Sequence, residues 1–223
     1  MFFPKASLMT NLPRHRLITR TGTAIALALL LAACGEPPGT PAAGYHAVDI
    51  RAVDWGRDFR MTDHAGQVRS LRDFKGKVVM MFFGFTQCPD ICPSTMADMA
   101  QAVNQLGGSA AEVQGLFVTV DPARDTPEVL AKYVTGFHPS FLGLRANEQS
   151  TQALADEFKA FYAARRPAPA PDSEHRHGDT APYMVDHTRA VYVFDRKGKL
   201  TLLITSGRTV DEIAADLNRL LRE

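Results

Sequence analysis

Residues 77–85 are almost all apolar, and this run constrains the fold of the chain more than any other feature. The run is too short for a free-standing helix. Its apolar residues do not alternate with polar ones, which is typical of a strand that is buried on both faces. We therefore expect it to form a strand in the middle of a sheet, with other elements covering both sides.

Strand and helix patterns alternate around this run. We expect further strands at 57–62, 67–70, 115–120, 141–144, 190–194 and 200–205, and helices at about 93–106, 127–136, 151–164 and 210–221. We expect the first two of these strands to form a hairpin through an Asp/Gly turn, and the last two to form a second hairpin. The order predicts an α/β domain with a central mixed β-sheet flanked by helices and an N-terminal β-hairpin extension, and it is compatible with a thioredoxin-like fold. The segment 165–182 is rich in proline and polar residues, and we expect a long mobile loop there.

Residues 1–33 have the pattern of an export signal. They carry basic residues and no acid, and an apolar run at 25–33 leads directly to Cys34. This run is shorter than the roughly 20 residues of a transmembrane helix. Its last residues resemble a bacterial lipobox, which implies a lipoprotein signal peptide that is cleaved before Cys34, with lipid attached to this cysteine. The alternatives are an ordinary signal peptide that leaves Cys34 as a free thiol, or an uncleaved anchor.

Processing at Cys34 would divide the rest of the chain into two parts. Residues 34–45 are rich in Pro, Gly and Ala and are typical of a flexible tether, and residues 46–223 form the folded domain. We expect the protein in the bacterial cell envelope, anchored by lipid to a membrane and facing the periplasm. The 25 basic and 24 acidic residues nearly balance and form no long basic run, which argues against a nucleic-acid partner.

The other two cysteines, Cys88 and Cys92, stand four residues apart where the apolar strand gives way to a helix. Residues with this spacing on a helix have Cβ atoms about 5–6 Å apart, so both sulfurs can converge on one ion or be oxidised to each other after slight adjustment. A helix N-terminus favours thiolate, which is both the metal ligand and the nucleophile. Redox thioredoxins have two residues between their cysteines, whereas three intervening residues allow a wider separation of the two sulfurs, which suits a bound ion. A structural disulfide in an oxidising compartment is the alternative.

Three ordered stretches of the chain, at 76–95, 120–127 and 185–188, carry a family resemblance. They read GKVVMMFFGFTQCPDICPST, VDPARDTP and VDHT. Together they closely resemble the signature stretches of the Sco/SenC family, and the similarity extends from about Trp55 to the last expected helix. Proteins of this family are thioredoxin-fold, membrane-tethered copper proteins that help to metallate the dinuclear copper site of cytochrome c oxidase. The resemblance implies that this chain is a copper metallochaperone of that kind.

By that resemblance the copper ligands are Cys88, Cys92 and His187. Soft thiolates select Cu(I), whereas imidazole accepts copper as Cu(I) or Cu(II). Three ligands leave an open side for transfer of the ion. A closed tetrahedral zinc site would need a fourth ligand, which His175 or His177 could supply. These two histidines could also form an auxiliary copper-capturing pair, although a solvated polar loop is the preferred interpretation.

The resemblance also implies partners for the protein. They are the copper-receiving subunit of cytochrome c oxidase, a periplasmic thiol reductant or another copper carrier, and the membrane through the lipid anchor. Gln87 departs from the family pattern, because many relatives have His before the first cysteine, but it is not one of the three ligands. We expect Asp186 to be a cap or a partner that orients the imidazole ring.

Two further groups of residues invite a role in copper binding, and we expect both to be structural. Four methionines fall on buried positions and are expected to fill the core: Met80, Met81, Met96 and Met99. The second signature stretch is expected to be a salt-bridged loop that supports the site, with Asp121, Arg124 and Asp125.

A second function competes for the same cysteine pair. As a periplasmic thiol-disulfide oxidoreductase, the protein would act on the cysteines of the oxidase, with Cys88 as the attacking thiol because it is nearer to the helix start and the solvent. The two roles can coexist, because an oxidised pair has to be reduced before it binds copper. Apart from this reductase activity, we do not expect an enzyme. A peroxidase is less well supported, because the sequence lacks the threonine-and-proline lead into a single peroxidatic cysteine.

Overall fold

The apolar run forms a central strand, β4 (Val78–Gly84), in which every residue is buried. It pairs in parallel with β5 (Val113–Thr119) and antiparallel with β9 (Val191–Phe194). The prediction of a strand in the middle of a sheet is therefore confirmed. The structure is a computed structural model that describes residues 44–165 and 183–223, so the expected signal peptide and Cys34 lie outside the described residues.

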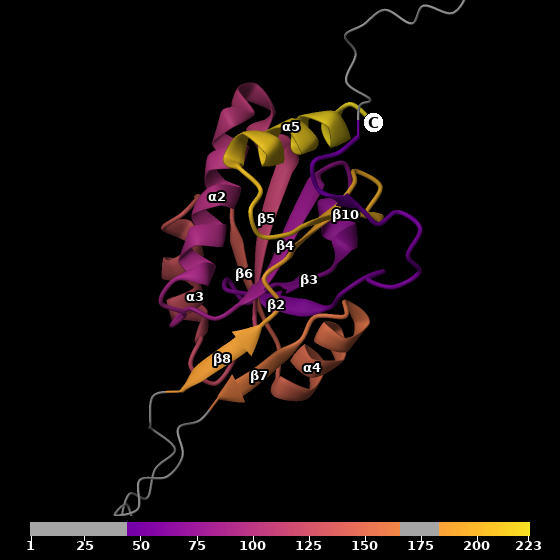
Figure 1. The fold of residues 1–223 in the computed structure, drawn as a ribbon. Helices are drawn as coiled ribbons and strands as arrows, with labels where there is room; N and C mark the ends of the chain where they lie inside the picture. Colours follow the sequence, from indigo (N-terminus) through magenta and orange to yellow (C-terminus); the bar gives the residue numbers. More distant parts are fainter. Residues whose placement is uncertain (1–43, 166–182) are drawn as a thin grey trace, which may run out of the picture. The chain divides into compact units, whose positions relative to one another are not determined.

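Seven more strands lie in the described part of the chain: β1 (Val48–Asp49), β2 (Met61–Asp63), β3 (Val68–Arg69), β6 (Leu142–Arg145), β7 (Tyr162–Arg165), β8 (Met184–His187) and β10 (Leu200–Ile204). The main sheet has the order β1-β10-β9-β4-β5-β6-β2-β3. Its β2-β3 and β9-β10 pairs are antiparallel, which confirms both predicted hairpins. The strands β7 and β8 form a separate two-stranded ribbon (Figure 1), which the sequence patterns did not predict.

The helices of the described residues are α2 (Ile91–Gln105), α3 (Pro127–Thr135), α4 (Glu148–Glu157) and α5 (Val210–Leu221), with short 3-10 segments η2 (Leu71–Phe74) and η3 (Gly107–Glu112). The Thr126 side chain caps α3 and the Thr209 side chain caps α5, because each accepts a backbone N–H from the first turn. The helices α2 and α5 pack against each other (Figure 1). None of the helices in the two described ranges has the length and apolar character needed to cross a membrane.

One predicted helix is shorter than expected. The pattern predicted a helix over 151–164, but α4 begins at Glu148 and ends at Glu157. Lys159 then adopts a positive φ of 52°, in the left-handed region that ends a right-handed helix. The chain turns there, and the N–H of Ala160 donates to the carbonyl of Ala155. The expected helical residues beyond this turn form β7 instead, and 166–182 of the expected loop lie outside the described residues.

The two faces of β4 have different neighbours. The ring of Phe83 packs against Phe158 and Tyr192, with centroids 5.8 and 5.7 Å away. Successive side chains of a strand point to opposite faces, so Phe82 and Gly84 lie on the other side. That side faces the cysteine-bearing start of α2, because a Cβ atom at Gly84 would lie 2.9 Å from the sulfur of Cys92.

Candidate metal centre

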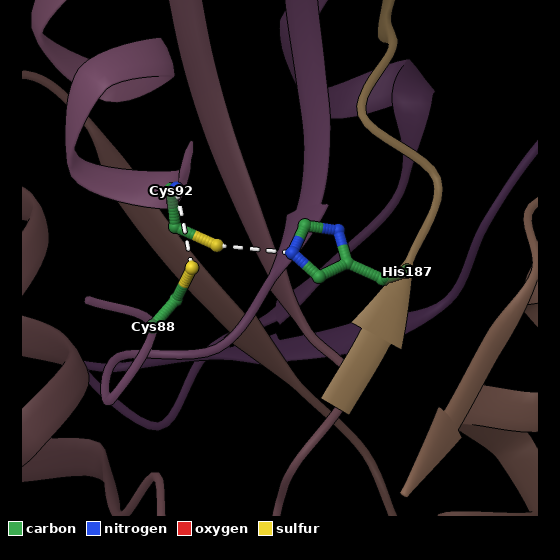
Figure 2. Close-up of side chains that lie close together, drawn as sticks. All are labelled: Cys88, Cys92 and His187. Atoms are coloured by element: carbon green, nitrogen blue, oxygen red, sulfur yellow. Dashed lines mark hydrogen bonds between the residues drawn. The ribbon is translucent and has the colours of Figure 1, made fainter. Parts of the chain in front are cut away.

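Three side chains from two distant parts of the chain meet beside the end of β4. The ligand atoms of Cys88, Cys92 and His187 all lie within 4.8 Å of one another, and they form the one group of three or more His, Cys, Asp or Glu ligands found within 44–165 and 183–223. Figure 2 shows the sulfur of Cys92 directed toward the imidazole ring and the sulfur of Cys88 directed toward Cys92. One ion placed between these atoms could contact all three.

The turn before α2 holds the two sulfurs together. Cys92 lies in the first turn of α2 and is fully buried, whereas Cys88 precedes the helix and is half-buried. The N–H of Cys88 donates to the carbonyl of Phe85, and the N–H of Cys92 donates to the sulfur of Cys88 at 3.4 Å. The spacing predicted that both cysteines lie on one face of a helix. Instead, Cys88 lies in the turn before α2 and Cys92 lies in the first turn of α2. The N–H bond from Cys92 fixes the position of the Cys88 sulfur beside the first turn of α2.

The thiol of Cys92 is packed tightly against the sheet. Burial is the largest cause that raises the pKa of the Cys92 thiol, so this group is protonated at neutral pH. The absence of a side chain at Gly84 makes room for the sulfur, since a Cβ atom there would lie 2.9 Å from it. The thiol therefore has to lose its proton before it can act as a thiolate ligand.

The imidazole of His187 has a defined tautomer. Its Nδ1 lies 2.9 Å from the carbonyl of Thr188, which can only accept, so Nδ1 carries the proton and donates it. The unprotonated Nε2 then faces the sulfur of Cys92 at 3.2 Å and accepts its S–H. Burial lowers the pKa of His187, which keeps the ring neutral. The same Nε2 lone pair is the one that a metal ion would use.

Aromatic rings fix the plane of this imidazole. The ring of His187 packs edge-on against Phe82 and Phe85, with centroids 5.7 and 5.9 Å apart. The expectation that Asp186 orients the ring is wrong. Its carboxylate instead accepts from Nε of Arg165 at 3.1 Å, on the neighbouring strand of the ribbon. Alternation along β8 turns Asp186 away from the face that carries His187.

The loop after β5 supports the cysteine turn through hydrogen bonds to Thr86. Asp125 is fully buried, and its carboxylate accepts from the N–H and hydroxyl of Thr86, at 3.1 and 2.6 Å, and from the hydroxyl of Thr119 at 2.5 Å. Burial is the first cause that raises the pKa of Asp125. In the same loop Asp121 forms an ion pair with Arg124. The predicted salt-bridged loop is therefore confirmed.

The other candidate residues divide into two groups. The four methionines are buried in the core, as predicted: Met80, Met81, Met96 and Met99. His175 and His177 lie outside the described residues.

The carbonyl of Thr188 was missed, because backbone acceptors have no signal in a sequence. The alternation of exposed and covered residues in β8, with Val185 buried, was a signal that could have revealed the strand.

Comparisons with known proteins agree with the geometry. The family model described as SCO1/SenC matches residues 48–222. A SCO2-like protein of Rickettsia felis is 37% identical over 174 residues, which cover 78% of this chain and 80% of that protein. The solved structure of Bradyrhizobium japonicum ScoI with copper bound is 30% identical, with a TM-score of 0.63, and the match covers 75% of this chain and 99% of that chain.

A second solved structure supports the same relationship. The apo Sco1 protein from Thermus thermophilus is 34% identical, with a TM-score of 0.67 over 81% of this chain and 99% of that chain. The predicted thioredoxin-like α/β fold is confirmed by these likenesses and by the mixed sheet with its flanking helices. The chain belongs to the SCO1/SenC family.

Proposed function

We propose that this protein is a copper metallochaperone for assembly of the dinuclear copper centre of cytochrome c oxidase. In this proposal Cys88, Cys92 and His187 bind the copper ion. The observation that carries the proposal is the convergence of two sulfurs and one imidazole nitrogen within 4.8 Å. The copper bound to the related Bradyrhizobium japonicum protein supports the choice of metal.

The donor set suits a copper ion that has to be handed on. Two thiolates stabilise Cu(I), and the imidazole remains a good ligand if the ion is oxidised. Three donors leave one side of the ion open to an incoming ligand from the partner. Because Cys88 is half-buried and Cys92 is fully buried, the partner would approach from the Cys88 side. Binding displaces the proton of Cys92, since its thiol is neutral in the free protein.

The proposal includes a location in the bacterial cell envelope. Residues 1–33 are removed, Cys34 carries the lipid, and 34–45 tether the folded domain of 46–223 to a membrane, facing the periplasm. Intact mass spectrometry of protein extracted from membranes tests this proposal. A lipid adduct on Cys34, and release of the Cys34→Ser variant from the membrane, are expected. An unmodified Cys34 on membrane-extracted protein would refute the anchor.

Copper titration of the reduced domain tests the ligand set. We expect one copper ion per wild-type chain and a large loss of affinity in Cys88→Ser, Cys92→Ser and His187→Ala. His46→Ala is the matched control, because His46 is exposed and pairs with Glu212 away from the cysteine turn. Equal affinities of wild type and His187→Ala would refute the three-ligand site. In cells that lack the protein, oxidase activity should be restored by wild type and not by His187→Ala.

One observation favours thiol-disulfide exchange as a second function of the same pair. Cys88 is partly accessible and accepts the N–H of Cys92, whereas the Cys92 thiol is buried and protonated. This asymmetry in exposure fits Cys88 as the attacking thiol and Cys92 as the resolving thiol. The pair would act on oxidase cysteines and be renewed by a periplasmic thiol reductant. A reductase would keep its activity in His187→Ala and lose it in Cys88→Ser. A chaperone would lose its function in both variants.

A further inference from the structure

Arg124 lies where three segments of the chain converge beside the cysteine turn. Its Nε forms an ion pair with Asp121 in its own loop. Its Nη1 donates to the side-chain oxygen of Gln87 at 3.2 Å and to the backbone carbonyl of Tyr183 at 3.0 Å. One planar guanidinium thus connects the loop after β5, the residue before Cys88 and the segment that leads into β8.

Tyr183 is held by this cluster in three ways. Besides the bond to its carbonyl, its ring lies under the guanidinium of Arg124, with the central carbon 3.6 Å from the ring centroid. Its hydroxyl donates to the carboxylate of Asp121 at 2.7 Å. The backbone, the ring face and the hydroxyl of Tyr183 are therefore all fixed to the loop after β5.

The strand that carries His187 lies outside the main sheet. Within the described residues it pairs only with β7, in a separate two-stranded ribbon, and such ribbons are marginally stable alone. At its far end Thr188 is tied to the backbone of Phe161 by bonds of 2.8 and 2.9 Å. At its near end the Arg124 cluster holds Tyr183, which comes just before β8. These two attachments, together with the burial of Val185, therefore help to set the distance from the imidazole to the thiols.

A second path connects the same guanidinium to the imidazole. The Arg124 guanidinium lies 5.7 Å from the centroid of Phe85. The ring of Phe85 in turn packs edge-on against His187, with the ring centroids 5.9 Å apart. Displacement of the guanidinium would therefore move both the segment before His187 and one of the rings that fixes its plane.

We infer that Arg124 and Tyr183 form a clamp that positions the imidazole of His187 against the thiols of Cys88 and Cys92. The clamp residues are positioning residues, because neither is among the grouped ligands. A lysine cannot replace the arginine, since one ammonium group cannot bind Asp121, Gln87 and the Tyr183 carbonyl while also stacking on two rings. The effect on copper rests on the proposed function, but the effect on the position of His187 does not.

The test compares Arg124→Lys with Arg69→Lys in the reduced, copper-free protein. Arg69 is the matched control, because it also forms an ion pair with a buried carboxylate, Asp63, but lies in the β2-β3 hairpin. NMR contacts between the ring protons of His187 and those of Phe82 and Phe85 report the position of the imidazole. We expect these contacts in wild type and Arg69→Lys and their loss in Arg124→Lys.

Copper affinity and two tyrosine variants complete the test. Loss of a residue that orients a ligand typically lowers metal affinity by about 10–100-fold, and we expect this for Arg124→Lys and Tyr183→Ala. Tyr183→Phe keeps the stacked ring and should retain the ring contacts of His187, whereas Tyr183→Ala should lose them. A general loss of stability on mutation would not produce this difference between the two variants. If Arg124→Lys does not fold, this tyrosine pair decides the question.

Two results would overturn the clamp, and a different result would overturn the proposed function. The clamp is wrong if Arg124→Lys keeps both the ring contacts and the copper affinity of wild type, or if Tyr183→Phe and Tyr183→Ala behave alike. A wild-type protein that binds no copper would instead refute the proposed function. The ring contacts of the copper-free protein would still decide whether the clamp positions His187.

Discussion

The sulfur of Cys92 and the Nε2 of His187 lie 3.2 Å apart, although 95 residues separate them in the sequence. Cys92 is placed by the start of α2 and His187 by the end of β8. A site assembled from such distant segments exists only when the domain is folded, so metal binding is coupled to folding. The contact is thus a property of the tertiary structure and not of the cysteine spacing.

Copper should therefore stabilise the reduced protein against unfolding. A ligand that binds only the folded state adds about 2.7 kcal/mol to the free energy of unfolding at a free concentration of 100 times its Kd. Denaturant titrations with and without Cu(I) measure this gain. It should shrink in His187→Ala and remain in His46→Ala. An equal gain in both variants would mean that the imidazole takes no part.

Oxidation of the cysteine pair should abolish copper binding. A disulfide between Cys88 and Cys92 would consume both sulfur donors and leave the imidazole of His187 as the one remaining donor of the group. Copper content after anaerobic gel filtration should fall to background in the oxidised protein and recover after reduction. Retention of copper by the oxidised protein would show that other groups bind the ion.

Gly84→Ala should push the Cys92 thiol out of its position. The new Cβ atom would lie 2.8 Å from the ring of Phe117 and 2.9 Å from the Cys92 sulfur, so a side chain has to move. Overpacking of this kind costs about 1–3 kcal/mol, and copper affinity should fall as well. Gly108→Ala is the control, because no atom lies within 4 Å of its added Cβ. Equal stability and copper affinity in the two variants would contradict the tight packing at Gly84.

Copper affinity should rise with pH. Burial raises the pKa of the Cys92 thiol, so copper has to displace its proton near neutral pH. Each displaced proton makes the affinity rise about tenfold per pH unit. Burial lowers the pKa of His187, so the imidazole is already neutral near pH 7. Copper therefore does not have to displace a second proton from this ring. Proton release on addition of Cu(I) at pH 7 measures the effect, and the absence of any release would contradict a buried neutral thiol.

Asp125→Ala should destabilise the loop that supports the cysteine turn. The change removes the acceptor for two donors of Thr86 and one of Thr119, and buried donors without partners cost about 1–3 kcal/mol each. Thermal denaturation should show a clear loss of stability. Asp54→Ala serves as the reference, because Asp54 is exposed. A loss no larger than that of Asp54→Ala would refute the supporting role of Asp125.

Periodicity revealed most of the fold but not the ribbon beside the site. The apolar run of β4 and the alternating hairpins are local patterns, and local patterns are what a sequence displays. The end of α4 depends instead on the positive φ of Lys159 and on burial of Phe158 against the sheet. The pairing of β7 with β8 joins two short strands across 166–182, and no local pattern indicates such a pairing.

The candidate site was predictable in its members and not in its arrangement. Spacing indicated the chemistry of the two cysteines, and the family resemblance indicated His187. The tautomer of His187 depends on the backbone carbonyl of Thr188, and its position depends on Tyr183 and Arg124. These contacts arise only when β8 lies beside the cysteine turn.

X-ray absorption of the copper-loaded, reduced protein identifies the ligands of the ion. We expect a copper ion bound by two sulfurs and one imidazole nitrogen, from Cys88, Cys92 and His187. The imidazole signal should disappear in His187→Ala and persist in His46→Ala. A copper site without two sulfur ligands in wild type, or an unchanged imidazole signal in His187→Ala, would contradict this ligand set.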